Sequence, residues 1–359
     1  MKSRLDQTHL TVYLGGNCNL RCSYCYSAAA SGTGADEKAV LASLDFFLAA
    51  ATASAKVTFL GGEPLLHGGL LKKAVQRIRA SAPDMPVTVF TNGTLLTPDW
   101  LYFFGAQRIK LTVSLDGGKS ANDASRRFRA GKDSVFLSVL RRLPAGARSS
   151  AAVSMVVTPR AAAGLASNIS RLKALGFNSI AWVPDLTALW RKRDILTLKK
   201  AALRAQLGYF RALRRGRAPY EVANIYEAVN EALTGERCSS CLNLTLGPDG
   251  NFYPCDKLLS APDALRRRYA MRPGSACLSF SKGKKFFSEA AAAGFSPSAG
   301  ACSIATWVFS SFCRRSPASG RGAFLAGHSE VGVFLAAWLA SLASGGLKAP
   351  AFRKLHSRP

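Results

Sequence analysis

The stretch Gly15-Gly16-Asn17-Cys18-Asn19-Leu20-Arg21-Cys22-Ser23-Tyr24-Cys25-Tyr26 decides how the chain is organised. It follows the apolar run Leu10 to Leu14, which predicts a β-strand ending in a compact loop. Three thiols within eight residues can converge on one soft-metal centre. A closed structural site generally uses four protein ligands, whereas a reactive centre keeps one coordination position open. We therefore expect Cys18, Cys22 and Cys25 to bind a reactive metal centre. A zinc knuckle completed by a distant residue and three metal-free buried thiols are the alternatives.

The cysteine spacing, with Tyr24 just before the third cysteine, resembles the signature of the radical S-adenosylmethionine (radical SAM) superfamily. The resemblance implies a [4Fe-4S] cluster held by Cys18, Cys22 and Cys25. It also implies that the fourth iron chelates the amino and carboxylate groups of SAM. Reductive cleavage of SAM would then yield a 5′-deoxyadenosyl radical.

A second motif, Gly61-Gly62-Glu63-Pro64, follows a β-branched run over 56–60 that predicts a strand. Two glycines let the backbone approach a ligand closely, and a carboxylate there can accept hydrogen bonds from an ammonium group. Alone, such a tetrapeptide is also an ordinary turn. In radical SAM proteins this segment follows the second strand, and the resemblance implies that Gly61, Gly62 and Glu63 bind the SAM amino group.

Strand and helix patterns alternate from the first motif to about residue 185, which predicts a parallel sheet. Strands are expected at 10–14, 56–60, 86–90, 109–113, 151–157 and 180–183, and helices at 36–51, 70–80, from Thr97 onward, and at 161–175. The fold class expected is α/β, a partial (β/α)6 TIM-type barrel with a C-terminal auxiliary iron–sulfur (SPASM-like) domain.

Polar residues follow several of these strands, where barrel enzymes keep their active sites. Asn92 and Tyr24 are expected to contact SAM, and Ser114 and Asp116 resemble the family's ribose-binding residues. Asp116 is equally a turn former. Asp185 either lines the substrate cavity or caps the next helix. The residues expected in a loop that closes over the cofactor are Asn122, Asp123, Arg126 and Arg127.

A second cysteine group begins at Cys238 and Cys241 and ends at Cys255. Between them an alternating run, a Pro-Asp-Gly turn and Phe252-Tyr253 predict a β-hairpin. The spacing from Cys238 through Gly250 to Cys255 resembles the opening of the SPASM domain of radical SAM maturases. We expect one auxiliary [4Fe-4S] cluster using Cys238 or Cys241 together with Cys255, with a zinc hairpin as the alternative. Later cysteines, Cys277, Cys302 and Cys313, are too widely spaced to reveal ligands for two complete clusters.

These motifs divide the chain into four expected parts. They are the barrel over 1–190, a helical linker over 191–237, the SPASM-like domain over 238–320 and a C-terminal helical tail over 321–359.

Composition and charge limit where the protein is expected to act and what it is expected to bind. The N-terminus is polar, and the longest apolar stretch, 331–344, is shorter than the roughly 20 residues needed to span a bilayer. A reducing cytoplasm suits nine cysteines. The net charge of +27 either marks a solvated basic surface or attracts an acidic partner. A basic helix over 197–217 could hold an acidic leader segment, and a more acidic helix is expected at 220–233.

We expect an oxidoreductase that abstracts hydrogen from a peptide substrate during maturation of a ribosomal peptide natural product, by crosslinking or oxidation. Maturation of a sulfatase or another folded protein is the alternative within the superfamily. A basic RNA-modifying or RNA-binding protein is the alternative from another class, although base-stacking motifs are absent. A ferredoxin or flavodoxin would donate electrons. Because only 17 residues precede Cys18, a leader peptide would need a separate recognition protein or the barrel's own surface.

Overall fold

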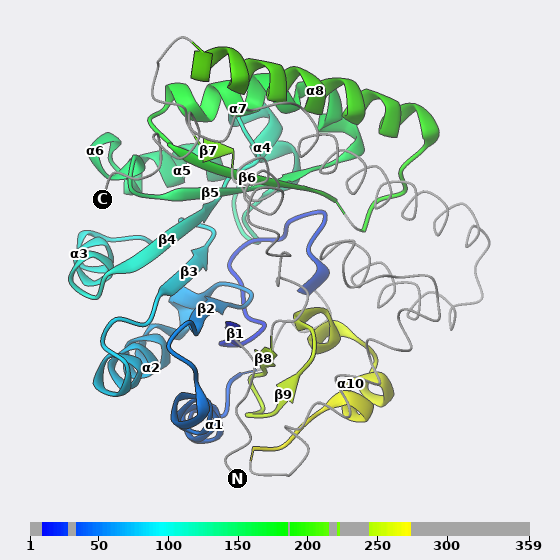
Figure 1. Ribbon diagram of the computed structural model, residues 1–359. Coiled ribbons are helices and arrows are strands. Elements are labelled where there is room, and N and C mark those ends of the chain that lie inside the picture. The colour runs from blue at the N-terminus through cyan, green and yellow to red at the C-terminus, as the bar shows by residue number, and fades with distance from the viewer. Residues whose placement is uncertain (1–8, 28–33, 186, 215–220, 223–243, 274–359) are drawn as a thin grey trace.

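A computed structural model describes residues 9–27, 34–185, 187–214, 221–222 and 244–273 of the chain. Within these ranges, alternating strands and helices form one curved sheet with helices on its outer side (Figure 1). The strands are β1 His9–Tyr13, β2 Lys56–Leu60, β3 Val87–Thr91, β4 Ile109–Ser114, β5 Ala152–Val157, β6 Ser179–Pro184, β7 Glu221–Val222, β8 Leu244–Leu246 and β9 Phe252–Tyr253. The longer helices are α1 Glu37–Ala50, α2 Gly68–Ser81, α3 Pro98–Ala106, α5 Val135–Arg142, α7 Leu165–Ala174 and α8 Lys192–Arg214. The shorter ones are α4 Lys119–Ser125, α6 Ala145–Arg148 and α10 Asp263–Tyr269.

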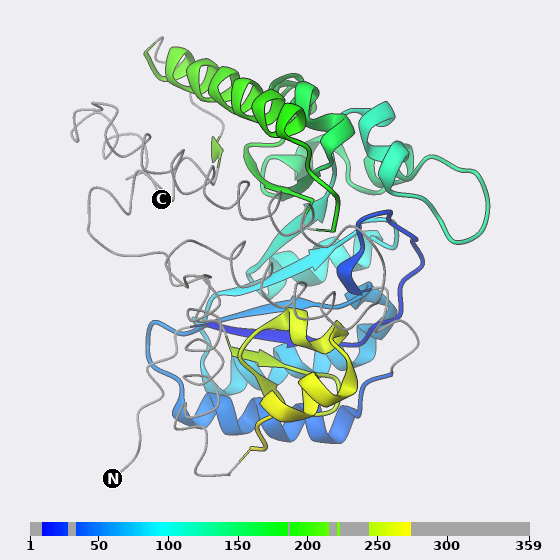
Figure 2. The ribbon, with the colours of Figure 1, turned by 90° about the vertical axis from the view of Figure 1, so that its right-hand side faces the viewer.

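The sheet runs in the order β7-β6-β5-β4-β3-β2-β1-β8-β9. Every neighbouring pair is parallel except β8 and β9, which form an antiparallel hairpin. This arrangement confirms the expected α/β barrel of parallel strands. The sequence-distant hairpin continues the same sheet, because β8 pairs with β1 through Leu10↔Leu244 and Val12↔Leu246. Figures 1 and 2 both show this segment beside β1.

The two faces of the sheet differ in chemistry. Leu10, Val12, Val57 and Phe59 are buried in the main hydrophobic core together with apolar residues of α1 and α2. Burial of such side chains contributes roughly 1.5–3 kcal/mol each and is the main force holding helices to the sheet. Residues one position along the strands point to the other face, where Thr245, Thr11, Thr58 and Thr88 lie in matched register.

Local signals explain where several helices begin. Asp36 caps α1 by accepting a hydrogen bond from the Ala39 backbone, as its position before the helix predicted. Thr97 caps α3 in the same way, with Pro98 at the first helical position.

Four expectations were wrong in detail. The helix expected at 161–175 is divided into a 3-10 segment, Pro159–Gly164, followed by α7. The basic helix begins at Lys192 rather than Thr197. Residues 221–222 form strand β7, paired with β6, where a helix over 220–233 was expected. Asn122 and Asp123 lie in α4 rather than in a loop. Strand pairing and helix caps determine such short elements, and they can outweigh a weak periodic pattern in the sequence.

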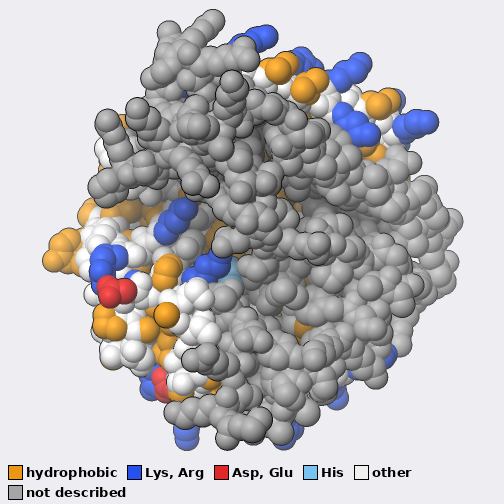
Figure 3. Space-filling view, viewed as in Figure 1, with side chains coloured by type: hydrophobic (Ala, Val, Ile, Leu, Met, Phe, Trp, Pro, Cys, Tyr) orange, Lys and Arg blue, Asp and Glu red, His pale blue; other side chains and the backbone are white. Residues whose placement is uncertain are grey.

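Helix α8 covers the outer side of the barrel's last units, where it packs against α7 and the 3-10 segment 159–164. Figure 3 shows hydrophobic and basic side chains next to one another along its exposed edge. No helix within the described ranges is long and apolar enough to cross a membrane.

Candidate functional site

The cysteine-bearing loop, residues 15–26, leaves the end of β1 and packs against the Gly-Gly-Glu-Pro segment after β2. The Gly62 N–H donates to the Gly15 carbonyl at 2.8 Å, and the Glu63 N–H donates to the Asn17 carbonyl at 2.8 Å. A Cβ on Gly61 would lie 2.7 Å from the Gly15 carbonyl oxygen. A Cβ on Gly62 would lie 2.5 Å from the Gly16 carbonyl oxygen and closer still to that of Asn17. These glycines are therefore required for the two loops to touch.

A second segment holds the loop from another side. Backbone N–H groups of Arg21 and Ser23 donate to the carbonyls of Arg127 and Ser125 at 2.8 and 2.9 Å. The Arg129 side chain donates to the Cys18 carbonyl at 2.8 Å. The stretch after α4 therefore binds the cysteine-bearing loop as a short antiparallel pair.

Cys18 and Cys22 are half-buried, Cys25 is exposed, and all three are free thiols. The Cys18 sulfur accepts hydrogen bonds from the Leu20 N–H at 3.4 Å and from Asn92 Nδ2 at 3.8 Å. Burial raises the pKa of the Cys18 thiol and raises that of Cys22 to about 11. Ligation must therefore supply the free energy that deprotonates these thiols.

The donor set fits an iron–sulfur cluster, because it comprises three thiols of which one faces solvent and one already receives N–H donors. Among the residues that the structure describes, no three His, Cys, Asp or Glu side chains are close enough to share a single metal ion. A four-iron cluster separates its thiolates more widely than one ion does, because each sulfur binds a different iron.

Glu63 is fully buried at the end of β2 and connects it to β3. Its carboxylate accepts hydrogen bonds from Leu65 N–H at 3.1 Å, Thr91 Oγ1 at 2.7 Å and Asn92 N–H at 2.7 Å. Burial raises the pKa of this carboxyl group, and the three donors oppose that rise. The Glu63 side chain therefore links the segment after β2 to the end of β3. The expectation that Glu63 contacts SAM did not include this structural role.

Asn92 connects the end of β3 to the cysteine-bearing loop. Its Nδ2 donates to Asn19 Oδ1 at 2.8 Å, and its own Oδ1 accepts from the Thr94 hydroxyl at 2.6 Å. Asn19 in turn donates to the Thr94 hydroxyl oxygen at 2.8 Å. Asn92, Asn19 and Thr94 thus form a closed ring of hydrogen bonds between the loop and the end of β3.

Asp116, two residues after Ser114 at the end of β4, is buried and enclosed by donors. Arg126 donates to it through Nε at 3.1 Å and Nη2 at 3.0 Å, and the Val156 N–H donates at 2.9 Å. The Tyr24 hydroxyl donates to the same carboxylate. Burial disfavours the charged guanidinium, but the paired carboxylate outweighs this and raises the Arg126 pKa above its usual value.

The Arg126 guanidinium also lies 5.3 Å from the centre of the Tyr24 ring. Tyr24 is therefore fixed at both its ring and its hydroxyl before the third cysteine. This geometry favours a structural role for Asp116 over contact with a ribose, since both carboxylate oxygens bond to protein groups.

Asp185 lies after β6 and organises the turn there. Its carboxylate accepts from the Thr187 N–H at 2.8 Å and hydroxyl at 2.7 Å, and its carbonyl accepts from Trp190 Nε1 at 2.8 Å. The helix cap expected as one alternative is not formed, because α8 begins only at Lys192.

Cys255 follows β9 and lies near the cysteine-bearing loop. The Tyr26 hydroxyl donates to Asp256 at 2.9 Å, and the Lys257 ammonium lies 3.8 Å from the centre of the Tyr26 ring. Burial opposes the charge of Asp256, but its ion pair with Lys257 and its hydrogen bonds outweigh that and lower the carboxyl pKa. The segment after Cys255 is thus connected directly to the residue after Cys25.

The other expected auxiliary ligands, Cys238 and Cys241, lie outside the described residues, as do Cys277, Cys302 and Cys313. Only Cys255 of that group lies among the described residues, half-buried and with its sulfur 3.7 Å from Asp256 Oδ1.

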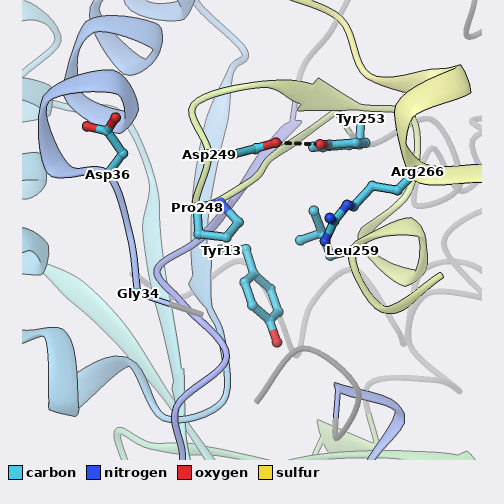
Figure 4. Close-up of a pocket in the computed structure, with 8 residues that line it drawn as sticks. All are labelled: Tyr13, Gly34, Asp36, Pro248, Asp249, Tyr253, Leu259 and Arg266. Atoms are coloured by element: carbon cyan, nitrogen blue, oxygen red, sulfur yellow. Dashed lines mark hydrogen bonds between the residues drawn. The ribbon is translucent and has the colours of Figure 1, made fainter. Parts of the chain in front are cut away.

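A cavity of about 390 Å³ opens beside this connection (Figure 4). Its wall combines aromatic, acidic and basic groups from β1, the segment before α1, the hairpin, the 3-10 segment Asp256–Ser260 and α10: Tyr13, Gly34, Asp36, Pro248, Asp249, Tyr253, Leu259 and Arg266. The Tyr253 hydroxyl donates to Asp249 at 2.7 Å, and Figure 4 shows the Tyr13 ring directed away from that pair. Burial raises the pKa of Tyr13 to about 12, so its hydroxyl stays protonated at neutral pH.

Sequence reasoning missed several residues that hold the site together, and each is adjacent in sequence to a motif residue. Their position beside a motif was the available signal. They are Asn19, Tyr26, Thr91 and Asp256.

Known proteins resemble this chain in sequence and in fold. The sequence pattern of the Radical SAM superfamily matches residues 12–159. The serine-type anaerobic sulfatase-maturating enzyme of Klebsiella aerogenes is 29% identical over 276 residues, which cover 71% of this chain and 67% of that enzyme. The cysteine-type enzyme of Clostridium perfringens is 27% identical over 127 residues, covering 32% and 34% of the two chains.

Two solved structures share the fold. Native anSMEcpe with bound AdoMet and Cp18Cys peptide has a TM-score of 0.69 at 18% identity, covering 94% of this chain and 99% of that one. Streptococcus suis SuiB bound to precursor peptide SuiA has a TM-score of 0.53 at 14% identity, covering 76% and 67%.

The described part of the chain is thus an α/β protein whose sheet, parallel except for its terminal hairpin, carries three cysteines in the loop after its first strand. Residues 12–159 match the Radical SAM superfamily, and the chain shares the fold of the anSMEcpe structure. The cofactors of this superfamily, a [4Fe-4S] cluster and SAM, are therefore those of this protein.

Proposed function

We propose that this protein is a radical SAM enzyme that abstracts hydrogen from a peptide or protein substrate. The observation that carries the proposal is the cysteine-bearing loop, which is held by the β2 and β3 ends and by residues 125–129. When bound, the cluster and SAM supply a 5′-deoxyadenosyl radical, and the protein's task is to orient the cofactors and exclude competing reactions.

Within this proposal Cys18, Cys22 and Cys25 ligate the catalytic cluster. Gly61 and Gly62 keep the SAM-binding backbone in contact with that loop, and their interlocked hydrogen bonds support this role. Tyr24, fixed by its contacts with Asp116 and Arg126, would support the loop that holds the cluster.

Asn92 donates toward the Cys18 sulfur at 3.8 Å, which supports its proposed contact with SAM beside the cluster ligands. Glu63 and Asp116 act chiefly by positioning these groups. Ser114, half-buried at the carboxyl end of β4, is the proposed contact with the SAM ribose.

An auxiliary cluster is part of the same proposal, with Cys255 and either Cys238 or Cys241 among its ligands. The contact between Tyr26 and Asp256 supports it, because this contact brings the Cys255 segment to the cysteine-bearing loop. The proposal divides the chain at about residues 190, 237 and 320. A ferredoxin or flavodoxin is the proposed electron donor, and a separate leader-recognition protein a proposed partner. Ligand thiols that must stay reduced favour the cytoplasm.

Anaerobic reconstitution tests the proposal. Wild type should bind at least about four irons and form 5′-deoxyadenosine from SAM, and Cys18→Ala should lose both. Cys255→Ala should lose iron beyond the first four while still cleaving SAM. Zinc in place of iron, or full 5′-deoxyadenosine formation by Cys18→Ala, would reject the assignment.

Sulfatase maturation is favoured among protein substrates by the similarity to serine-type and cysteine-type sulfatase-maturating enzymes. Maturation of a ribosomal peptide is favoured by the fold shared with a SuiB structure bound to a precursor peptide. Mass spectrometry of sulfatase-derived serine and cysteine peptides after incubation separates the two. Oxidation of those peptides supports the first substrate class, and its absence with a SAM-cleaving enzyme supports the second.

A further inference from the structure

Helix α8 carries two apolar stripes, although a helix at the barrel surface needs only one. The inner stripe, Ile195, Leu198, Ala202, Ala205 and Tyr209, is buried against the barrel's outer layer. The outer stripe consists of Leu196, Leu203 and Leu207, which are 49%, 52% and 44% exposed. At about 100° per residue, these three leucines lie within roughly 40° of one another and about 140° from the centre of the buried stripe.

Basic side chains border the outer stripe on both sides. At the same angular step, Lys192 and Lys199 lie along one border, and Arg193, Lys200 and Arg204 along the other. All five are exposed, and Asp194 is the helix's single acidic residue. Figure 3 shows this alternation of apolar and basic side chains along the edge of the molecule.

The spacing of the leucines specifies what can pack on them. Intervals of seven and four residues are those of successive d, d and a positions of a coiled-coil seam, in which Lys200 takes the a position between Leu196 and Leu203. Burying exposed leucine in such a seam is favourable, and charged residues at the seam's borders select the partner by their sign.

The bordering charges exclude two occupants. A second copy of α8 would place rows of lysine and arginine opposite each other, which is unfavourable. The chain's own last hundred residues contain only three acidic residues, Asp263, Glu289 and Glu330, and so cannot match five basic ones.

We propose that the outer stripe of α8 binds an acidic amphipathic helix of a partner polypeptide. The partner's apolar residues pack on Leu196, Leu203 and Leu207, and its flanking carboxylates pair with the two basic borders. The surface lies on the outer layer of the barrel, where α8 packs against α7, and it includes no residue of the cysteine-bearing loop, so the proposal does not depend on the reaction catalysed.

Fluorescence anisotropy with the full-length, cluster-loaded protein tests it. The probe is a labelled synthetic peptide of about three heptads with leucine at a and d and glutamate at e and g. A second peptide carries lysine in place of each glutamate. We expect the glutamate peptide to bind wild type at least tenfold more tightly than the lysine peptide, and more weakly as salt rises.

Variants separate the apolar and charged parts of the surface. Leu203→Asn with Leu207→Asn should weaken the glutamate peptide at least tenfold, and Lys200→Glu with Arg204→Glu should reverse the preference between peptides. Tyr102→Asn, at an 80% exposed aromatic on α3, is the matched control and should leave binding unchanged.

Absence of binding would overturn the proposal. Equal binding of the glutamate peptide to wild type and to the leucine variant would also overturn it, because that binding would reflect general charge attraction alone. Two further results would assign the stripe to another occupant and also overturn it. If the leucine variant lowers the sedimentation mass, the stripe joins two copies. If it lowers the melting temperature, the chain covers the stripe itself.

Discussion

Replacing Gly62 by alanine tests why glycine stands after β2. The added Cβ would lie 2.5 Å from the Gly16 carbonyl oxygen and closer still to that of Asn17. These are backbone atoms, so the two loops must separate. Separation also stretches two hydrogen bonds, from Gly62 N–H to Gly15 and from Glu63 N–H to Asn17, both 2.8 Å long.

The magnitude follows from these two effects. Overpacking typically costs about 1–3 kcal/mol, and each lost hydrogen bond costs about 1 kcal/mol. We therefore expect Gly62→Ala to lower the free energy of unfolding of the cluster-free protein by about 3–5 kcal/mol. Urea titration under anaerobic conditions, followed by circular dichroism, measures this as a lower denaturation midpoint.

Gly105→Ala is the matched control. Gly105 lies in α3 with no atom near an added Cβ, so alanine there should be neutral or stabilise by up to about 1 kcal/mol.

The outcome separates two reasons for the glycine. If Gly62 serves only to admit SAM, the alanine variant will unfold at the wild-type urea concentration and only SAM binding will weaken. That result would refute the close-packing argument.

Three further predictions concern buried polar groups. Arg126→Met should destabilise by about 3–5 kcal/mol, since it leaves a buried carboxylate unpaired, whereas exposed Arg127→Met should cost little; equal urea midpoints would contradict this. Tyr26→Phe removes the hydrogen bond to Asp256 and should destabilise by about 1 kcal/mol, with a wild-type melting temperature counting against the contact. Burial raises the pKa of Glu63 from 4.5, so its stabilising contribution is full below about pH 4.5 and falls as pH rises through the raised value. Glu63→Gln should lack that fall in urea titrations across this range, and parallel pH profiles would show the argument to be wrong.

Much of the barrel was predictable because its signals are local. The apolar spacing and the Asp36 cap located α1, and the β-branched run located β2 at its observed bounds. The two cysteine-bearing motifs and the Gly-Gly-Glu-Pro segment were likewise visible as short patterns.

What was not predictable depends on contacts between distant segments. Nothing in the hairpin sequence indicates that β8 pairs with β1, since strand partners are chosen by tertiary packing. Asp116 and Arg126 are both evident in the sequence. Their ion pair, and the Tyr24 hydroxyl that joins it, appear only when β4, α4 and the cysteine-bearing loop come together.

The pairing of β8 with β1 has a consequence for biosynthesis. Because β1 carries the cysteines at its carboxyl end, its edge stays open until residues 244–246 have left the ribosome. Closing so long a loop is slow. Cluster insertion into a growing chain would therefore meet an incompletely supported strand, and we expect iron to be acquired only after synthesis has passed the hairpin.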